Sequence, residues 1–124
     1  MKNVLNNVNT LSNVIYWRLD VTSGKLEQLL GPTGRIYGLS KDFFYKNPRE
    51  GWLEAVHKND REIAENSEKL LRFKDRASVE YRIQNRNNGV IFYVKDTKIR
   101  EKLAGKNIIH GFLTLLTNQS EYIH

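Results

Sequence analysis

The sequence predicts an α+β domain in which a five-stranded antiparallel sheet packs against helices that lie across one face. Two observations lead to this prediction. Residues 77–117 contain three consecutive strand-like segments separated by turn residues, and two more such segments lie between residues 14 and 30. The helical patterns fall between these two groups of strands. A sheet with one apolar face has to cover it, so we expect the intervening helices to pack there.

Length and composition restrict what the chain can be. Its 124 residues, 40% hydrophobic and 27% charged, are typical of one globular domain. The absence of cysteine excludes disulfides, thiolate metal sites and a cysteinyl–flavin adduct. No apolar run approaches the roughly 18 residues that a membrane span requires. We also see no signal peptide at the N-terminus, so we expect no membrane segment and a cytoplasmic location.

The net charge of +6 is concentrated in one part of the chain. Residues 69–106 contain eleven Lys or Arg against four Asp or Glu, which gives this segment a net charge of +7. Such a basic strand surface favours the alternative hypothesis of a small protein that binds nucleic acid or other anions. The favoured interpretation is that alternate strand residues simply face water, because no aromatic–basic recognition motif accompanies the charges. A salt titration of binding to random DNA distinguishes the two.

The N-terminal segments predict a flanking helix and a hairpin. Residues 1–13 carry apolar side chains at helical spacing, although their five asparagines weaken a helix. Val14–Val21 alternates apolar and polar residues, as a half-buried strand does. Thr22-Ser23-Gly24 supplies a turn, and Lys25–Leu30 is the second strand of the hairpin.

The central segment predicts several short helices and one longer one. The short pieces are residues 36–39, residues 41–46 after Ser40 as N-cap, and residues 50–56, all of which need packing to persist. The longer helix is expected to begin at Asn59, paired with Glu62 as a capping box. Its buried stripe is predicted to consist of Ile63, Ser67, Leu70 and Leu71. Its exposed side is predicted to carry the ion pairs Glu65–Lys69 and Glu68–Arg72.

The last third of the chain predicts the remaining strands. Val79–Gln84 alternates apolar and polar residues, and residues 87–89 form a tight turn. Residues 90–99 continue with β-branched and aromatic side chains, and residues 103–107 make the next turn. Ile108–Thr117 is the most apolar segment, and we expect it to be the last strand.

Four stretches resemble a known family. They are Leu-Leu-Gly at 29–31 with Tyr-Gly at 37–38, Trp-Leu-Glu-Ala-Val-His-Lys-Asn-Asp-Arg at 52–61, Glu-Tyr-Arg-Ile at 80–83 with Asn-Gly and Phe-Tyr-Val, and Gly111 with Leu-Leu-Thr at 115–117. In this order they resemble the PAS domain family over residues 14–118, most closely the subclass in bacterial sensor histidine kinases and diguanylate cyclases. Lys58 replaces the usual proline. Leu115 replaces the family's terminal aspartate, so Leu115 and Thr117 mark the signal-transfer position.

The resemblance implies a sensory and dimerisation module of a larger bacterial signalling protein. Such a module binds a small ligand or a partner and relays the signal to an effector, and this chain alone is not expected to be an enzyme. Residues 119–124 would then start a truncated linker. A homodimer is expected to form through the N-terminal flank and the sheet face. Nucleic acid is the less favoured partner.

Site residues follow partly from the resemblance and partly from spacing. His57, His110 and His124 do not stand at metal-ligand spacing, so no catalytic residue and no metal site is predicted. His57, with Asn59 and Asp60, is expected to have a structural role at a helix start, and haem ligation by His57 is the alternative. No cofactor is evident, while haem or flavin stays open.

A ligand pocket between sheet and helices is expected among Phe43, Phe44, Trp52, Ile63, Tyr81, Phe92 and Phe112. The alternative is that these side chains only fill the core.

Overall fold

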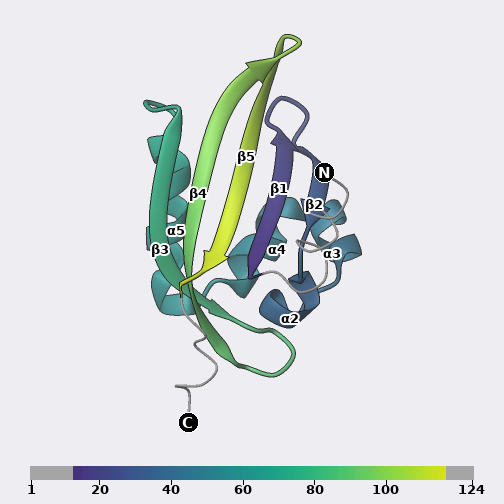
Figure 1. The fold of residues 1–124 in the computed structure, drawn as a ribbon, viewed down its shortest axis with the longest axis vertical. Helices are drawn as coiled ribbons and strands as arrows, with labels where there is room; N and C mark the ends of the chain where they lie inside the picture. Colours follow the sequence, from purple (N-terminus) through teal and green to yellow (C-terminus); the bar gives the residue numbers. More distant parts are fainter. Residues whose placement is uncertain (1–12, 117–124) are drawn as a thin grey trace.

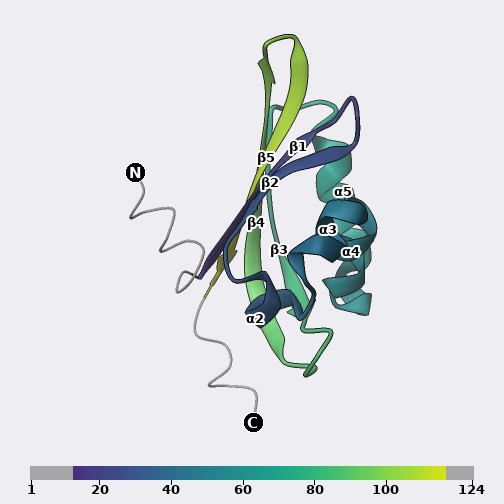
Figure 2. The same cartoon turned by 90° about the vertical axis from the view of Figure 1, so that its right-hand side faces the viewer.

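One sheet of five antiparallel strands spans the molecule, and its helices all lie across a single face (Figures 1 and 2). The computed structural model describes residues 13–116. The strand order is β2-β1-β5-β4-β3. The strands are β1 (Val14–Asp20), β2 (Lys25–Leu30), β3 (Arg76–Gln84), β4 (Ile91–Leu103) and β5 (Lys106–Leu115). The predicted fold class is therefore confirmed. Residues 1–12 of the predicted flank, Thr117 and the predicted linker at 119–124 lie outside the described residues.

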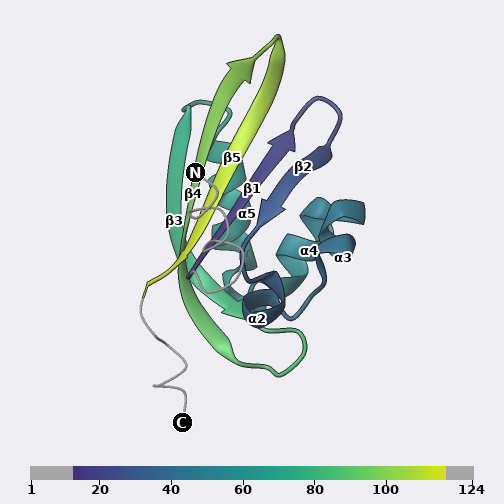
Figure 3. The ribbon, with the colours of Figure 1, turned by 45° about the vertical axis from the view of Figure 1, so that its right-hand side comes forward.

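The N-terminal hairpin joins the C-terminal strands through the pairing of β1 with β5. Their register runs from Val14 opposite Thr114 to Asp20 opposite Ile108, so the apolar β5 lies at the centre of the sheet. β4 and β5 form a long hairpin, which extends past the β1–β2 turn (Figure 3). Its turn is tighter than predicted, because Ala104 and Gly105 both adopt positive φ and the strands continue to Leu103 and from Lys106.

The helices are short, as predicted, and are held by packing. They are α2 (Thr33–Tyr37), α3 (Lys41–Lys46), α4 (Pro48–Ala55), η1 (Lys58–Asp60) and α5 (Arg61–Leu70). The predicted cap of α3 is confirmed, since Ser40 Oγ accepts a hydrogen bond of 3.2 Å from the Phe43 amide. α4 begins two residues earlier than predicted because Pro48, which lacks an amide hydrogen, suits the first turn of a helix.

The start of α5 differs from the prediction. Asn59 does not cap it: its amide donates to His57 Nδ1 at 3.2 Å, inside the separate turn η1. Asp60 stands at the N-cap but makes no side-chain cap. Its carboxylate instead accepts hydrogen bonds of 2.8 and 2.9 Å from the Arg82 guanidinium on β3. The guanidinium donates to both carboxylate oxygens in a bidentate geometry that a single helix amide cannot provide, so Asp60 pairs with β3 instead of capping α5.

The face that α5 turns to the sheet also differs. Ser67 and Leu71 are buried as predicted, but Ile63 and Leu70 are 44% and 45% exposed. Ala64, fully buried, takes the central position, since a small side chain lets the helix approach the sheet. Neither predicted ion pair within α5 is present among the described contacts. Glu65 and Glu68 both pair with Arg49 of α4.

The core lies between the sheet and the helices. Its sheet side is built from alternate residues of the central strands, such as Ile15, Val94 and Leu113, which are at most 1% exposed. The helices contribute Ile36, Phe44 and Ala55. Within residues 13–116, no helix has the length and hydropathy that a membrane crossing requires.

Candidate functional site

A cavity of about 380 Å³ lies between the sheet and the helices α3, α4 and α5. Most of its wall is aromatic or aliphatic: Trp17, Leu26, Leu29, Tyr37, Phe44 and Trp52. Its polar wall consists of Arg49, Glu50, Glu68 and Lys98. The chain has two tryptophans, and both line this cavity. A concave, mostly apolar site of this size with a few polar groups is the usual form of a small-molecule site.

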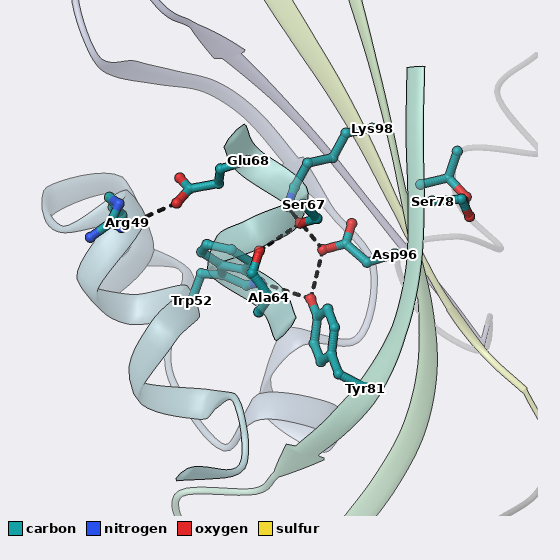
Figure 4. A network of polar contacts seen from close by, with 10 residues as sticks. Arg49, Trp52, Ala64, Ser67, Glu68, Ser78, Tyr81, Asp96 and Lys98 are labelled. Atoms are coloured by element: carbon teal, nitrogen blue, oxygen red, sulfur yellow. Dashed lines mark hydrogen bonds and ion pairs between the residues drawn. The ribbon is translucent and has the colours of Figure 1, made fainter. Parts of the chain in front are cut away.

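A buried polar network includes two residues of the cavity wall, Trp52 and Lys98 (Figure 4). The Trp52 indole donates to the Tyr81 hydroxyl at 2.8 Å, and that hydroxyl donates to Asp96 Oδ2 at 2.6 Å. Lys98 Nζ lies 3.3 Å from the same carboxylate oxygen and donates to Ser67 Oγ at 2.9 Å. These side chains come from α4, β3, β4 and α5, so the network connects the helices to the sheet.

The electrostatics of this network depend on its burial. The side chains of Asp96 and Lys98 are 1% and 4% exposed, and their opposite charges balance each other. Burial raises the pKa of the Tyr81 phenol well above its usual range, and the neighbouring Asp96 carboxylate raises it further. Tyr81 therefore stays protonated and donates to Asp96. The Lys98 ammonium lies 4.2 Å from the centre of the Trp52 ring, which is a cation–π contact.

A more exposed ion-pair cluster links two helices beside the cavity. Arg49 Nη2 of α4 lies 3.1 Å from Glu65 Oε2 and 3.1 Å from Glu68 Oε1 of α5. The three side chains are between 36% and 56% exposed, so water screens them and each pair adds little stability. These pairs connect α4 to α5 at the border of the cavity.

The structure brings some of the predicted pocket residues together. Phe44 and Trp52 line the cavity, and the Tyr81 hydroxyl accepts a hydrogen bond from the Trp52 indole. Phe92 is buried in the core on the same side of the sheet, and Phe43 meets Phe44 edge-on at a ring distance of 6.4 Å. Tyr81 and Phe92 thus belong to the sheet and the other three rings to α3 and α4, and only Phe44 and Trp52 form the cavity wall.

Two predicted pocket residues, Ile63 and Phe112, do not belong to the cavity. Ile63 is 44% exposed on α5, because the helix directs Ala64 toward the sheet instead. Phe112 lies on the outer face of the sheet, 5.1 Å from the Tyr16 ring. The alternation along β5 explains its placement, since Gly111 and Leu113 occupy the helix-facing positions.

Sequence reasoning missed Trp17, Lys98 and Asp96. A signal for the last two is present in the sequence. Residues 92, 94, 96 and 98 share one face of β4, and Phe92 and Val94 mark that face as buried. Two opposite charges at the next alternate positions of a strand, on the face that its apolar residues mark as buried, indicate a buried ion pair. An unpaired charge at such a position would be costly. Trp17 reaches the cavity only because it packs over Gly111 of the neighbouring strand.

The predicted histidine and signal-transfer positions lie elsewhere. His57 makes the η1 bond described above, at the start of the helical segment. His110 lies on the outer face, where Nδ1 is 2.8 Å from the Tyr16 hydroxyl and Nε2 is 2.7 Å from Glu101 Oε1. Leu115 is half-buried at the end of β5, opposite Val94. In the described part of the chain, no three His, Asp or Glu side chains gather as metal ligands.

The comparisons agree with this architecture. Residues 31–110 match the family model described as PAS fold. The chain belongs to the PAS family, whose members include sensory domains of histidine kinases and diguanylate cyclases. A comparison with curated proteins found no match.

Solved structures give the same fold at low sequence identity. A domain of a protein described as a light and redox sensing histidine kinase from Haloarcula marismortui has a TM-score of 0.73 at 20% identity, over 94% of this chain and 100% of that chain. The N-terminal domain of a diguanylate cyclase with PAS/PAC sensor from Marinobacter aquaeolei has a TM-score of 0.64 at 17% identity, over 90% and 99%. A PAS domain from a two-component sensor histidine kinase has a TM-score of 0.61 at 16% identity, over 92% and 94%.

Proposed function

We propose that this domain is a sensory module that binds a small molecule in the cavity between sheet and helices and relays its occupancy to an effector of a larger protein. The observation that carries the proposal is the position of the polar network. Trp52 and Lys98 line the cavity and are bonded to Tyr81, Ser67 and Asp96 behind it. A ligand in contact with Trp52 or Lys98 therefore acts on α4, α5, β3 and β4 together.

The relay follows the sheet. β4 carries Asp96 and Lys98 and pairs with β5 from Val94 to Leu103, and β5 ends at Leu115. A ligand that favours one packing of the helices on β4 shifts the populations of two arrangements, and the end of β5 passes the shift on. With leucine instead of an acidic side chain at this position, coupling depends on packing. We assign the effector to a histidine kinase or diguanylate cyclase class, in a cytoplasmic protein.

The outer face of the sheet is the dimerisation surface in this proposal, together with the N-terminal flank. It exposes aromatic side chains at Tyr93 and Phe112, which are 44% and 36% exposed. Exposed aromatic residues are typical anchors of protein interfaces. The Tyr93→Glu/Phe112→Glu variant is expected to be monomeric where the natural chain is dimeric, as measured by light scattering. A natural chain that is monomeric at high micromolar concentration contradicts this part of the proposal.

A resident cofactor is not part of the proposal. No histidine lines the cavity within residues 13–116, so a haem there would lack the usual axial ligand. Purified protein is therefore expected to show no haem absorbance. A visible spectrum typical of haem would contradict this expectation.

The test is a screen of small metabolites by thermal shift and tryptophan fluorescence, which reports on both cavity tryptophans. Leu29, 5% exposed, lines the cavity, whereas Ile63 lies outside it. Leu29→Phe is expected to abolish the changes in melting temperature and fluorescence that binding compounds cause, because the larger ring fills the cavity. The substitution is expected to lower the stability by about 1–3 kcal/mol. The matched variant Ile63→Phe is expected to keep the changes that binding causes. Hits that survive Leu29→Phe, or a screen without hits, contradict the proposal.

A further inference from the structure

A second cavity of about 260 Å³ adjoins the first. The two share Trp17, Leu19, Glu68 and Lys98, so they meet beneath α5 and beside β1. Beyond this shared wall, the second cavity is lined by Val21, Leu71, Arg72, Arg100 and Ile109. Together they form a groove whose ends differ in character. The first end is largely aromatic and aliphatic, and the second carries two arginines.

The charges of the groove do not cancel at its second end. Glu68 is paired with Arg49, and Lys98 is paired with Asp96. Arg72 and Arg100 line the second cavity, and neither has an ion-pair partner among residues 13–116. Lys98 Nζ has three N–H donors, of which Ser67 and Asp96 occupy two. The junction and the second end thus hold cationic donors that a carboxylate can bind.

The first end suits an apolar group and selects little else. Its aromatic and aliphatic wall is described above, and its charged residues, Arg49, Glu50, Glu68 and Lys98, sum to zero. A cavity of about 380 Å³ accommodates a body of roughly ten to twenty non-hydrogen atoms. The first end therefore fits the apolar part of a ligand, and the second end fits an anionic group of the same ligand.

We propose that the ligand of this groove is an amphipathic monocarboxylate, with its apolar body between Trp17 and Trp52 and its carboxylate toward Lys98, Arg72 and Arg100. This inference rests on the proposed function and names the class of ligand. It places the charged group beside Arg72 and Arg100, which have no ion-pair partner among residues 13–116, and beside the remaining N–H donor of Lys98. Anionic ligands of this kind would lose affinity as salt increases, because the arginines are partly in water.

The test measures decanoate and decanol binding by the fluorescence of the two tryptophans. The natural chain is expected to bind decanoate roughly tenfold more tightly than decanol. The Arg72→Ala/Arg100→Ala variant is expected to lose most of that preference, while Arg72→Lys/Arg100→Lys keeps part of it. The matched control is Arg76→Ala/Lys95→Ala, which removes two positive charges from exposed positions outside the groove and is expected to keep the full preference.

A second arm replaces the aliphatic pair with 2-naphthoate and 2-naphthylmethanol, and the pair that binds identifies the apolar body. Equal affinity for acid and alcohol in both pairs overturns the inference, as does a preference that the arginine variant leaves intact. Absence of binding in both pairs also overturns it. Hits in the metabolite screen that disappear in Leu29→Phe would still support the proposed function, so failure of the ligand class and failure of the sensory cavity are separate results.

Discussion

Gly111 determines where one of the two cavity tryptophans lies. It faces Trp17 in the β1–β5 pairing, and a Cβ at this position would overlap the indole ring. Trp17 can therefore lie flat on β5 only while residue 111 has no side chain. The glycine thus shapes the cavity wall from the neighbouring strand.

Gly111→Ala is expected to displace the Trp17 ring and to lower the free energy of unfolding by about 1–3 kcal/mol. Near-ultraviolet circular dichroism and chemical denaturation measure the two effects. Gly34→Ala is the control, since a Cβ at Gly34 in α2 meets no atom within 4 Å and its φ is not positive. An unchanged tryptophan signal in Gly111→Ala would show that Trp17 is not held by this contact.

At Asp60, the stability of the fold depends on the protonation of one carboxyl group. The Arg82 guanidinium, which is hydrogen-bonded to Asp60, lowers the pKa of that carboxyl below its usual range. A carboxyl with a lowered pKa in the folded state stabilises the fold above its unfolded pKa of about 4, and that stabilisation disappears as the pH falls through the folded value.

Asp60→Asn is expected to cost about 1–3 kcal/mol at pH 7, because it removes the charge from hydrogen bonds that Arg82 makes. The difference from the natural chain is expected to shrink as the pH falls below about 4. Urea denaturation at several pH values measures it. Glu62→Gln removes a carboxylate from the exposed first turn of α5 and should change little. A cost independent of pH would contradict the assignment.

At the scale of elements, Asn85 connects α2 to the β3–β4 turn. This side chain is 3% exposed. Its Nδ2 donates to the Arg35 carbonyl oxygen at 2.9 Å, near the end of α2, and its Oδ1 accepts from the amides of Asn87 and Asn88 at 2.8 and 3.0 Å. One amide group therefore satisfies a helix end and a turn together, which a carboxylate cannot do.

Asn85→Asp is expected to destabilise the domain by about 2–3 kcal/mol, because it loses the donor to α2 and places a charge against carbonyl oxygens. Asn88→Asp makes the same chemical change where only the acceptor is used, since Asn88 Oδ1 accepts from the Val90 amide at 2.9 Å. That control is expected to change stability by less than about 0.5 kcal/mol. Thermal denaturation compares them, and equal losses would argue against the bridging role of Asn85.

At the scale of the whole molecule, the basic excess is partly neutralised by residues from other segments. Of the eleven basic residues at 69–106, Arg82 pairs with Asp60, Arg86 with Glu54, and Lys106 with both Asp20 and Glu27. These acids all lie outside the basic segment. The charge that remains is spread over a helix end, an edge strand, the outer sheet face and the groove that Arg72 and Arg100 line.

Binding to random double-stranded DNA is accordingly expected to be micromolar or weaker at physiological salt, in the range of non-specific attraction. Fluorescence anisotropy over a salt series measures it. Tight binding that falls steeply with salt would favour the nucleic-acid hypothesis over a sensory role, and the aromatic outer face of the sheet would then be the surface to mutate first.

Much of the fold could be predicted from the sequence, because strand and helix periodicities are local. The alternation in Val79–Gln84 and the turn at Asn88-Gly89 predicted β3 and its hairpin, and Ser40 predicted the cap of α3. The candidate site was predictable only in part. Phe44 and Trp52 are aromatic residues on helices, which indicates burial, but a ring that fills the core and a ring that lines a cavity have the same sequence pattern.

The sequence by itself determined the five strands, the order of the elements and membership of the PAS family. Only the tertiary structure decided which long-range partners the polar residues take: Asp60 with Arg82, Asn85 with α2, and Asp96 with Lys98, Tyr81 and the helices behind them. The physical reason is that periodicity depends on neighbours within a few residues. The partner of a buried polar group depends on which distant segments the packed sheet and helices bring within hydrogen-bonding distance.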